Sequence, residues 1–222
     1  MRIFLDLDGP ILDVSEKYYS VYCDLIGEME GVALSKDKYW ELKRNRVNKG
    51  KILEESMIFG REEEYSKDRR ERIETLDYLK IDSIWPGIPE ALDMIGEFFP
   101  LYLVTARTNR SGLIWQMQRL GIYDTFTNII SPIERETSLP RRELKGTMVR
   151  RELGNLDLSG WFIGDTDTDT SAGNLLGLNT GVVTYGIRSK EIVTTYGADE
   201  VFHTPSEFID WVRNHLTGTL SS

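Results

Sequence analysis

Cysteine, histidine and long apolar runs are all scarce in this chain of 222 residues. A single cysteine, Cys23, excludes an internal disulfide framework and is typical of a reducing compartment. The two histidines, His203 and His215, match no metal-ligand spacing. No stretch is apolar enough to predict a transmembrane span, and the first residues lack the pattern of a signal peptide. We therefore expect a cytoplasmic protein without a membrane partner.

Positive charge is also in the minority. The chain has 27 Lys and Arg against 36 Asp and Glu, a formal net charge of −9. Because nucleic acid is itself negative, we expect no nucleic-acid partner. A small anionic substrate stays open, since a metal ion, a lysine or a helix N-terminus can bind a phosphate locally. The length fits one core with a smaller inserted domain, as a monomer or a homodimer.

Short apolar segments alternate with helical patterns along most of the chain. This alternation predicts an α/β fold, a doubly wound parallel sheet with helices on both faces. We expect strands at 3–7, 101–105, 128–131, 161–164, 181–185 and 200–203. We expect helices at 89–98, 111–120, 147–153, 172–176, 190–196 and 206–216.

Residues 14–85 interrupt the alternation. They contain no convincing strand, show helical periodicity and are rich in Glu, Lys, Arg, Tyr and Met. The sequence therefore predicts a helical domain at 14–85, inserted into an α/β core formed by 1–13 and 86–222.

Two acids follow the first predicted strand in the sequence FLDLDGP. In extended backbone Asp6 and Asp8 project to the same side, toward the crevice beyond the carboxyl ends of the strands. Burying carboxylates there is costly unless cations or hydrogen bonds compensate them. The pattern predicts a ligand site, although polar residues that merely end a strand give the same pattern.

Further polar side chains follow later strands. The sequence LVTARTN offers the Thr105 hydroxyl, backbone N–H groups around Ala106 and the cation of Arg107, all suited to an oxyanion. Lys145 comes just before the helix expected at 147–153, so its ammonium could reach back into the crevice. Taken alone, each also fits an ordinary helix start or a basic surface segment.

Three acids alternate in the sequence GDTDTDT. Asp165, Asp167 and Asp169 repel one another unless a cation lies among them, and oxygen ligands suit Mg²⁺. An EF-hand loop is excluded because its glycine and glutamate positions hold Thr170 and Leu176.

In this order the four motifs resemble those of the haloacid dehalogenase superfamily, in its phosphoglycolate phosphatase and β-phosphoglucomutase branch. The resemblance implies a Rossmann-like core with a helical cap, and a Mg²⁺-dependent phosphatase acting on a small phosphorylated metabolite. A phosphomutase of the same family and a non-catalytic phospho-acceptor or binding protein are the alternatives.

The resemblance also implies residue roles. Asp6 would attack phosphorus to form an aspartyl-phosphate, and Asp8 would protonate the leaving oxygen and then activate water. The implied phosphate-binding residues are Thr105, Ala106, Arg107 and Lys145. The implied metal ligands are Asp6, Asp8 through its backbone carbonyl, Asp165 and Asp169, the last of which could instead fix Lys145.

Two features of the sequence depart from the family or extend it. Pro10 stands where the family commonly has a threonine that bonds the second aspartate, so the sequence does not say what orients Asp8. In the basic run LKRNRVNKGK, Arg46 and Lys49 are candidates for binding a second anionic group of the substrate. A solvated helix face is the competing interpretation of this run.

Overall fold

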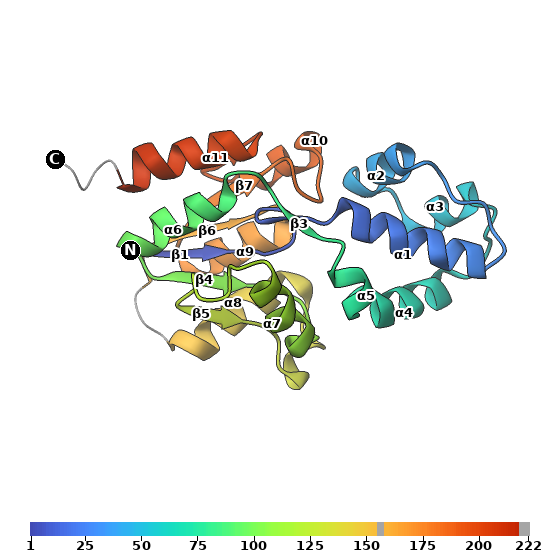
Figure 1. The fold of residues 1–222 in the computed structure, drawn as a ribbon, viewed down its shortest axis with the longest axis horizontal. Coiled ribbons are helices and arrows are strands. Elements are labelled where there is room, and N and C mark those ends of the chain that lie inside the picture. Colours follow the sequence, from blue (N-terminus) through green and yellow to red (C-terminus); the bar gives the residue numbers. More distant parts are fainter. Residues whose placement is uncertain (155–157, 218–222) are drawn as a thin grey trace.

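Six parallel strands form the central sheet of the computed structural model, which describes residues 1–154 and 158–217 (Figure 1). Their spatial order is β5-β4-β1-β6-β7-β8. The strands are β1 Arg2–Leu5, β4 Leu101–Val104, β5 Asn128–Ile130, β6 Gly160–Gly164, β7 Asn179–Val183 and β8 Glu200–Phe202. The fold class and the six strands predicted from the sequence are thereby confirmed.

The strand β1 lies at the point where the strand order reverses. Leu5 at its end is in register with Leu103 of β4 and Ile163 of β6, so these three strands end level with one another. In open α/β sheets ligands bind beyond the carboxyl ends at such a point. The loops that follow β1, β4 and β6 therefore share one crevice.

Helices cover both faces of the sheet because successive residues of β1 point to opposite sides. Ile3 and Leu5 belong to a buried cluster with α6, α7 and α11, whereas Phe4 belongs to one with α8 and α9. The helices of the core are α6 Ile88–Phe98, α7 Arg110–Arg119, α8 Arg141–Leu153, α9 Asp167–Leu176, α10 Lys190–Val193 and α11 Pro205–Trp211. Single turns η1 Glu134–Glu136 and η2 Thr194–Tyr196 and the π-helical segment η3 Val212–Thr217 complete it.

A helical lobe, defined here as residues 15–79, lies beyond the carboxyl ends of the strands (Figure 1). It has its own buried cluster, in which Tyr22 stacks on Tyr39 at 4.2 Å between ring centroids. Its helices are α1 Ser15–Glu28, α2 Lys36–Arg44, α3 Lys49–Glu55, α4 Glu62–Arg72 and α5 Leu76–Leu79. The two connections to the core pair as short antiparallel strands, β2 Leu12–Asp13 and β3 Ser83–Ile84.

Some boundaries differ from the prediction. Helix α8 begins at Arg141, directly after Pro140, so Lys145 lies inside the helix and not before it. The residues of this first turn and a half are mostly good helix formers, which explains the earlier start. The strand β3 is a second departure, since no strand was expected in 14–85.

Across residues 1–154 and 158–217, no helix has both the length and the apolar character that a bilayer span requires.

Candidate active site

Asp6 is the first residue beyond β1 and is only 7% exposed. Its backbone N–H donates to the carbonyl of Ile163 at 3.0 Å, which ties the end of β1 to β6. The Lys145 ammonium lies 2.8 Å from its carboxylate. Burial raises the pKa of Asp6 to about 7, against the opposing effect of Lys145. An anionic Asp6 therefore depends on nearby positive charge.

Lys145 is fixed between two carboxylates. Its Nζ lies 2.8 Å from Asp6 and 2.5 Å from Asp169. The other oxygen of Asp169 accepts hydrogen bonds from the N–H of Asp165 and from the N–H and hydroxyl of Thr166. Although burial opposes it, Asp169 and Asp6 raise the pKa of Lys145 above its usual value, so the side chain stays charged. Asp169 thus orients Lys145.

Asp165 follows β6 and is fully buried. Its Oδ2 accepts a hydrogen bond from the N–H of Ile187, whereas its Oδ1 has no hydrogen-bond partner among the described residues. Burial raises the pKa of Asp165 well above its usual value, and Asp6 and Asp169 add to the effect. A buried oxygen without a partner is costly in the absence of a cation.

Carboxylate oxygens of Asp6, Asp165 and Asp169 lie within 4.8 Å of one another. Gly9 has a φ of 107°, and its backbone lies against the side chain of Asp165. A Cβ atom at this position would clash with the Asp165 carboxylate. Hard divalent cations prefer such oxygen ligands. The cluster is compatible with a divalent metal ion. Such an ion would also explain why one buried oxygen of Asp165 has no hydrogen-bond partner among the described residues.

Asp8 belongs to a separate buried network. The Arg107 guanidinium donates two hydrogen bonds to its carboxylate, from Nη2 at 2.5 Å and from Nε at 2.9 Å. Lys17 of α1 lies 3.5 Å from Asp8 and 2.6 Å from Asp82, which also contacts Arg107 and Gln116. Although burial opposes it, Arg107 and Lys17 lower the pKa of Asp8 below its usual value. The ionised form of Asp8 is therefore strongly favoured.

These contacts explain how Asp8 is oriented beside Pro10. The carbonyl of Pro10 accepts a hydrogen bond from Tyr185 at 3.2 Å, and within the described residues no hydrogen bond joins Pro10 to Asp8. Arg107 instead holds both oxygens of Asp8. Lys17 and Asp82 were missed from the sequence because they are 65 positions apart and belong to no motif.

The remaining predicted phosphate-binding residues of the core follow β4. Thr105 is buried, its N–H donates to Ile130 at 3.0 Å, and its hydroxyl accepts the N–H of Arg107 at 3.3 Å. Ala106 between them is exposed. The structure thus brings the β4 loop to the same edge as Asp6, while the Arg107 side chain is engaged with Asp8.

The two candidates in the helical lobe differ in position. Arg46 reaches the core, with its Nη1 3.5 Å from Asp167. Lys49 instead donates a hydrogen bond to the Ser66 hydroxyl within the lobe, at 2.5 Å. Only Arg46 is therefore placed next to the acidic loop.

Comparison with known proteins bears on this arrangement. The family model described as haloacid dehalogenase-like hydrolase matches residues 3–183. The chain belongs to this family. The haloacid dehalogenase-like match spans β1 to β7 and includes all four motifs, so the resemblance predicted from the sequence is confirmed. No curated protein sequence matches the chain.

Solved structures of haloacid dehalogenase-like proteins share the fold at low sequence identity. A haloacid dehalogenase-like family hydrolase from Streptococcus pneumoniae is 18% identical, with a TM-score of 0.75 over 95% of this chain and 97% of that one. A predicted phosphoglycolate phosphatase from Haemophilus somnus is 15% identical, with a TM-score of 0.68 over 94% and 96%. A protein provisionally assigned as a β-phosphoglucomutase from Thermotoga maritima is 16% identical, with a TM-score of 0.67 over 97% and 100%. At these identities the similarity establishes the fold alone.

Proposed function

We propose that this hydrolase is a Mg²⁺-dependent phosphatase that acts on a small phosphorylated metabolite through an aspartyl-phosphate. One observation carries the proposal: the buried carboxylate of Asp6 lies 2.8 Å from Lys145 and belongs, with Asp165 and Asp169, to a cluster whose carboxylate oxygens lie within 4.8 Å of one another. A carboxylate can attack a phosphate only if positive charge offsets their mutual repulsion. Lys145 supplies positive charge directly, and the carboxylates of Asp6 and Asp165 would hold a cation that supplies more at the same point.

The proposed reaction has two steps. In the first, an Asp6 oxygen attacks phosphorus, the bond between phosphorus and the leaving oxygen breaks, and Asp8 gives that oxygen a proton. In the second, Asp8 takes a proton from water, the water oxygen attacks phosphorus, and the bond to Asp6 breaks. Thr105 and Lys145 would hold phosphoryl oxygens, and each step balances with one proton carried by Asp8.

Asp6, Asp165 and the backbone carbonyl of Asp8 would hold the Mg²⁺ ion. When bound, the ion supplies positive charge that offsets the charge of the phosphate. Asp169 has its oxygens engaged with Lys145, Thr166 and backbone N–H groups, which favours a positioning role for it.

We further propose that residues 14–85 act as a cap over the crevice, attached through β2 and β3. Lys17 of α1 and Asp82 beside β3 contact each other, and both contact the network around Asp8 and Arg107. A cap closed over the site would exclude water during the first step.

The choice of test substrate follows from the state of Asp8. Because Arg107 favours the ionised form of Asp8, only a small fraction of Asp8 carries the proton that the first step requires. Esters whose leaving group is itself acidic need this proton least and should be hydrolysed fastest. We expect p-nitrophenyl phosphate to be hydrolysed with MgCl₂, hydrolysis to stop with excess EDTA, and MgCl₂ to restore it. Absence of phosphate release from this ester and from a panel of phosphorylated metabolites, with Mg²⁺, Mn²⁺ or Co²⁺, would contradict the proposal.

A phosphomutase is the second candidate, because the same buried aspartate, lysine and acid cluster would serve it. A mutase uses the same residues but returns the phosphoryl group to another hydroxyl. Free phosphate from a purified substrate supports the phosphatase, whereas an isomeric phosphate ester supports the mutase.

The acid cluster predicts how metal binding depends on pH. The pKa of Asp6 is raised to about 7 and that of Asp165 is raised well above its usual value, in both cases mainly by burial. An unfolded aspartate loses its proton near pH ~4, so the metal-free fold loses stability as the pH rises from there toward 7. A bound cation stabilises the ionised carboxylates and so offsets this loss of stability. Protons compete with the cation for the same carboxylate oxygens.

We therefore expect the increase in melting temperature caused by MgCl₂ to grow from pH 5 to pH 8. Differential scanning fluorimetry with and without EDTA measures it. In Asp165→Asn the increase should be small at every pH. An increase that is largest at pH 5 would contradict a metal site at these acids.

A further inference from the structure

Two aromatic residues from distant parts of the chain hold the turn formed by residues 9–11. Trp85, which directly follows β3, donates from its indole Nε1 to the carbonyl of Gly9 at 2.8 Å and from its backbone N–H to that of Ile11 at 3.1 Å. The hydroxyl of Tyr185, which lies shortly after β7, donates to the carbonyl of Pro10 at 3.2 Å. The two rings contact each other edge to face, with 5.5 Å between their centroids. Three successive carbonyls therefore depend on one aromatic pair.

The carbonyls of Gly9 and Pro10 need these donors. Both residues are buried, and both lie outside the helices and strands, so regular secondary structure supplies them with no partner. Pro10 also has no N–H with which to build an alternative turn. Since a buried carbonyl without a donor is unfavourable, the turn keeps this conformation only while Trp85 and Tyr185 are in place.

The turn is one of two backbone segments that lie against the carboxylate of Asp165. A Cβ atom at Gly9 in the first segment, or at Gly186 in the second, would clash with this carboxylate. Ile187 of the second segment also donates its N–H to Asp165. Tyr185 belongs to the second segment, and its hydroxyl donates to the first. One hydrogen bond thus joins the two segments that enclose Asp165.

The same turn sets the direction of the Asp8 carbonyl. That carbonyl and the N–H of Gly9 belong to one planar peptide unit, so they move together. The Gly9 N–H donates to Leu12 at 3.0 Å, and the carbonyl on the other side of Gly9 accepts from Trp85. Both the Asp8 carbonyl and the Asp165 carboxylate are proposed metal ligands, so the aromatic pair acts on two ligands at once.

We propose that Trp85 and Tyr185 are positioning residues for the divalent metal ion, which keep the Asp8 carbonyl and the Asp165 carboxylate at the spacing that the ion requires. This inference rests on the proposed metal-dependent function. Within the described residues neither aromatic side chain hydrogen-bonds to an acid of the cluster, so each acts through the backbone. Changing a group that orients metal ligands typically lowers metal affinity by about 10–100-fold.

Neither residue was predicted from the sequence to belong to the site. Trp85 is 76 positions from Gly9, and Tyr185 is 175 positions from Pro10. Their contacts depend on the crossing of three loops beyond the sheet, which no local pattern encodes.

Binding of Mn²⁺ tests the proposal without turnover, since electron paramagnetic resonance measures the free ion. Tyr185→Phe removes only the hydroxyl, and Trp85→Phe removes the indole N–H while an aromatic ring stays against Tyr185. In each variant we expect the dissociation constant of Mn²⁺ to rise about tenfold. Asp165→Asn, which lacks a proposed ligand, identifies the part of the binding that belongs to this site.

The dependence of p-nitrophenyl phosphate hydrolysis on MgCl₂ gives a second readout. In Tyr185→Phe about tenfold more MgCl₂ should be needed for half the maximal rate. The rate at saturating MgCl₂ should stay close to that of the wild type. A merely structural role would instead lower the rate at every concentration of MgCl₂.

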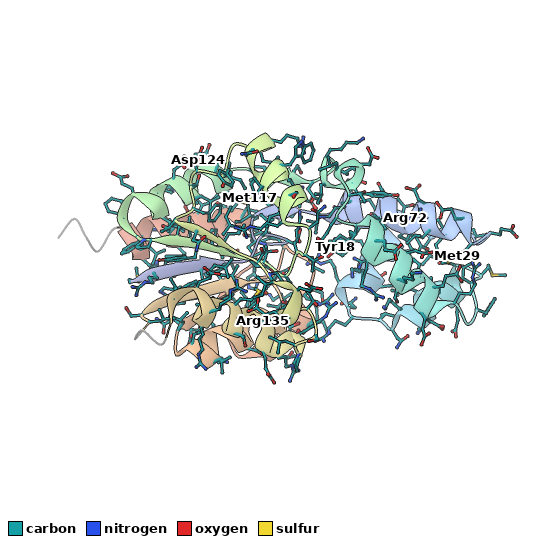
Figure 2. The ribbon with its side chains drawn as sticks, turned by 90° about the horizontal axis from the view of Figure 1, so that it is seen from below. Tyr18, Met29, Arg72, Met117, Asp124 and Arg135 are labelled. Atoms are coloured by element: carbon teal, nitrogen blue, oxygen red, sulfur yellow. The ribbon has the colours of Figure 1, made fainter. Side chains whose placement is uncertain are left out.

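Tyr22→Phe is the matched control. The Tyr22 hydroxyl is also buried and shares a hydrogen bond with Ser56 Oγ at 2.6 Å, but it lies in the helical lobe. Figure 2 shows Tyr18 at the junction of the lobe with the core and Met29 near the far end of the lobe, and Tyr22 lies between them along α1. Both tyrosine variants should melt below the wild type, because each leaves a buried polar group without its partner. Only Tyr185→Phe should bind Mn²⁺ more weakly.

Unchanged Mn²⁺ affinity in both Tyr185→Phe and Trp85→Phe, or an equal loss in Tyr22→Phe, would overturn the positioning role. Absence of Asp165-dependent Mn²⁺ binding in the wild type would overturn it together with the proposed metal site.

Failure of the proposed function is recognised separately, by hydrolysis of p-nitrophenyl phosphate in the wild type. If the wild type hydrolyses this ester and both variants bind Mn²⁺ as it does, only the positioning role is wrong. Weaker Mn²⁺ binding in both variants without any hydrolysis by the wild type would support the positioning role and contradict the phosphatase.

Discussion

Replacing Asp6 by asparagine is expected to lower kcat on p-nitrophenyl phosphate by about a thousandfold or more, the usual scale for removal of a nucleophile. A carboxamide cannot form the phosphoryl bond that the first step requires. After an acid quench, the wild type should carry phosphate on the peptide that contains Asp6, and Asp6→Asn should carry none. Mass spectrometry of the digested protein measures both.

The shape of the site should survive this change. Asparagine is nearly isosteric with aspartate, and Lys145 keeps its partner Asp169 at 2.5 Å. Asp167→Asn is a matched control, because Asp167 is an acid at the start of α9 on the same edge of the sheet, and its partners are the exposed cations Arg46 and Arg142. We expect its kcat to stay within about twofold of the wild type, because Asp167 is partly exposed and contacts neither Asp6 nor Lys145 in an ion pair. Full activity in Asp6→Asn would require another nucleophile.

Much of the site could be predicted from the sequence because three of the four motifs directly follow a buried strand. Parallel strands place their carboxyl ends on one edge, so Asp6, Thr105 and Asp165 had to converge once the strand pattern was recognised. The regular alternation of apolar and polar segments was therefore enough to predict both the fold class and the position of the crevice.

The partners of each charge could not be predicted in the same way. Arg107 was expected to bind phosphate, but its guanidinium contacts Asp8 and Asp82, residues 99 and 25 positions away. These contacts depend on how the two connections of the lobe pass over β1, which no local pattern encodes. The start of α8 was missed for a related reason, since its charged first turns resemble a loop and lack an apolar period.

Lys145→Met is the second change with a large expected effect. Lys145 is buried at 3% exposure and is an ion-pair partner of both Asp6 and Asp169. Its loss leaves three buried carboxylates without that cation, and breaking a buried ion pair typically costs about 3–5 kcal/mol. Chemical denaturation in EDTA should show a decrease of this size in the free energy of unfolding.

The pH and metal dependence of Lys145→Met identifies the cause of its instability. Without the ammonium, the pKa of Asp6 should rise further, so the carboxylates become protonated and the loss of stability shrinks as the pH falls from 8 to 5. MgCl₂ should stabilise this variant more than the wild type, because a bound cation would replace the lost charge. Arg142→Met, a change at an exposed arginine one turn earlier in α8, should alter stability by less than about 0.5 kcal/mol. A loss of stability in Lys145→Met that is independent of pH and unaffected by MgCl₂ would mean that the side chain stabilises the core by packing, and not by compensating the acids.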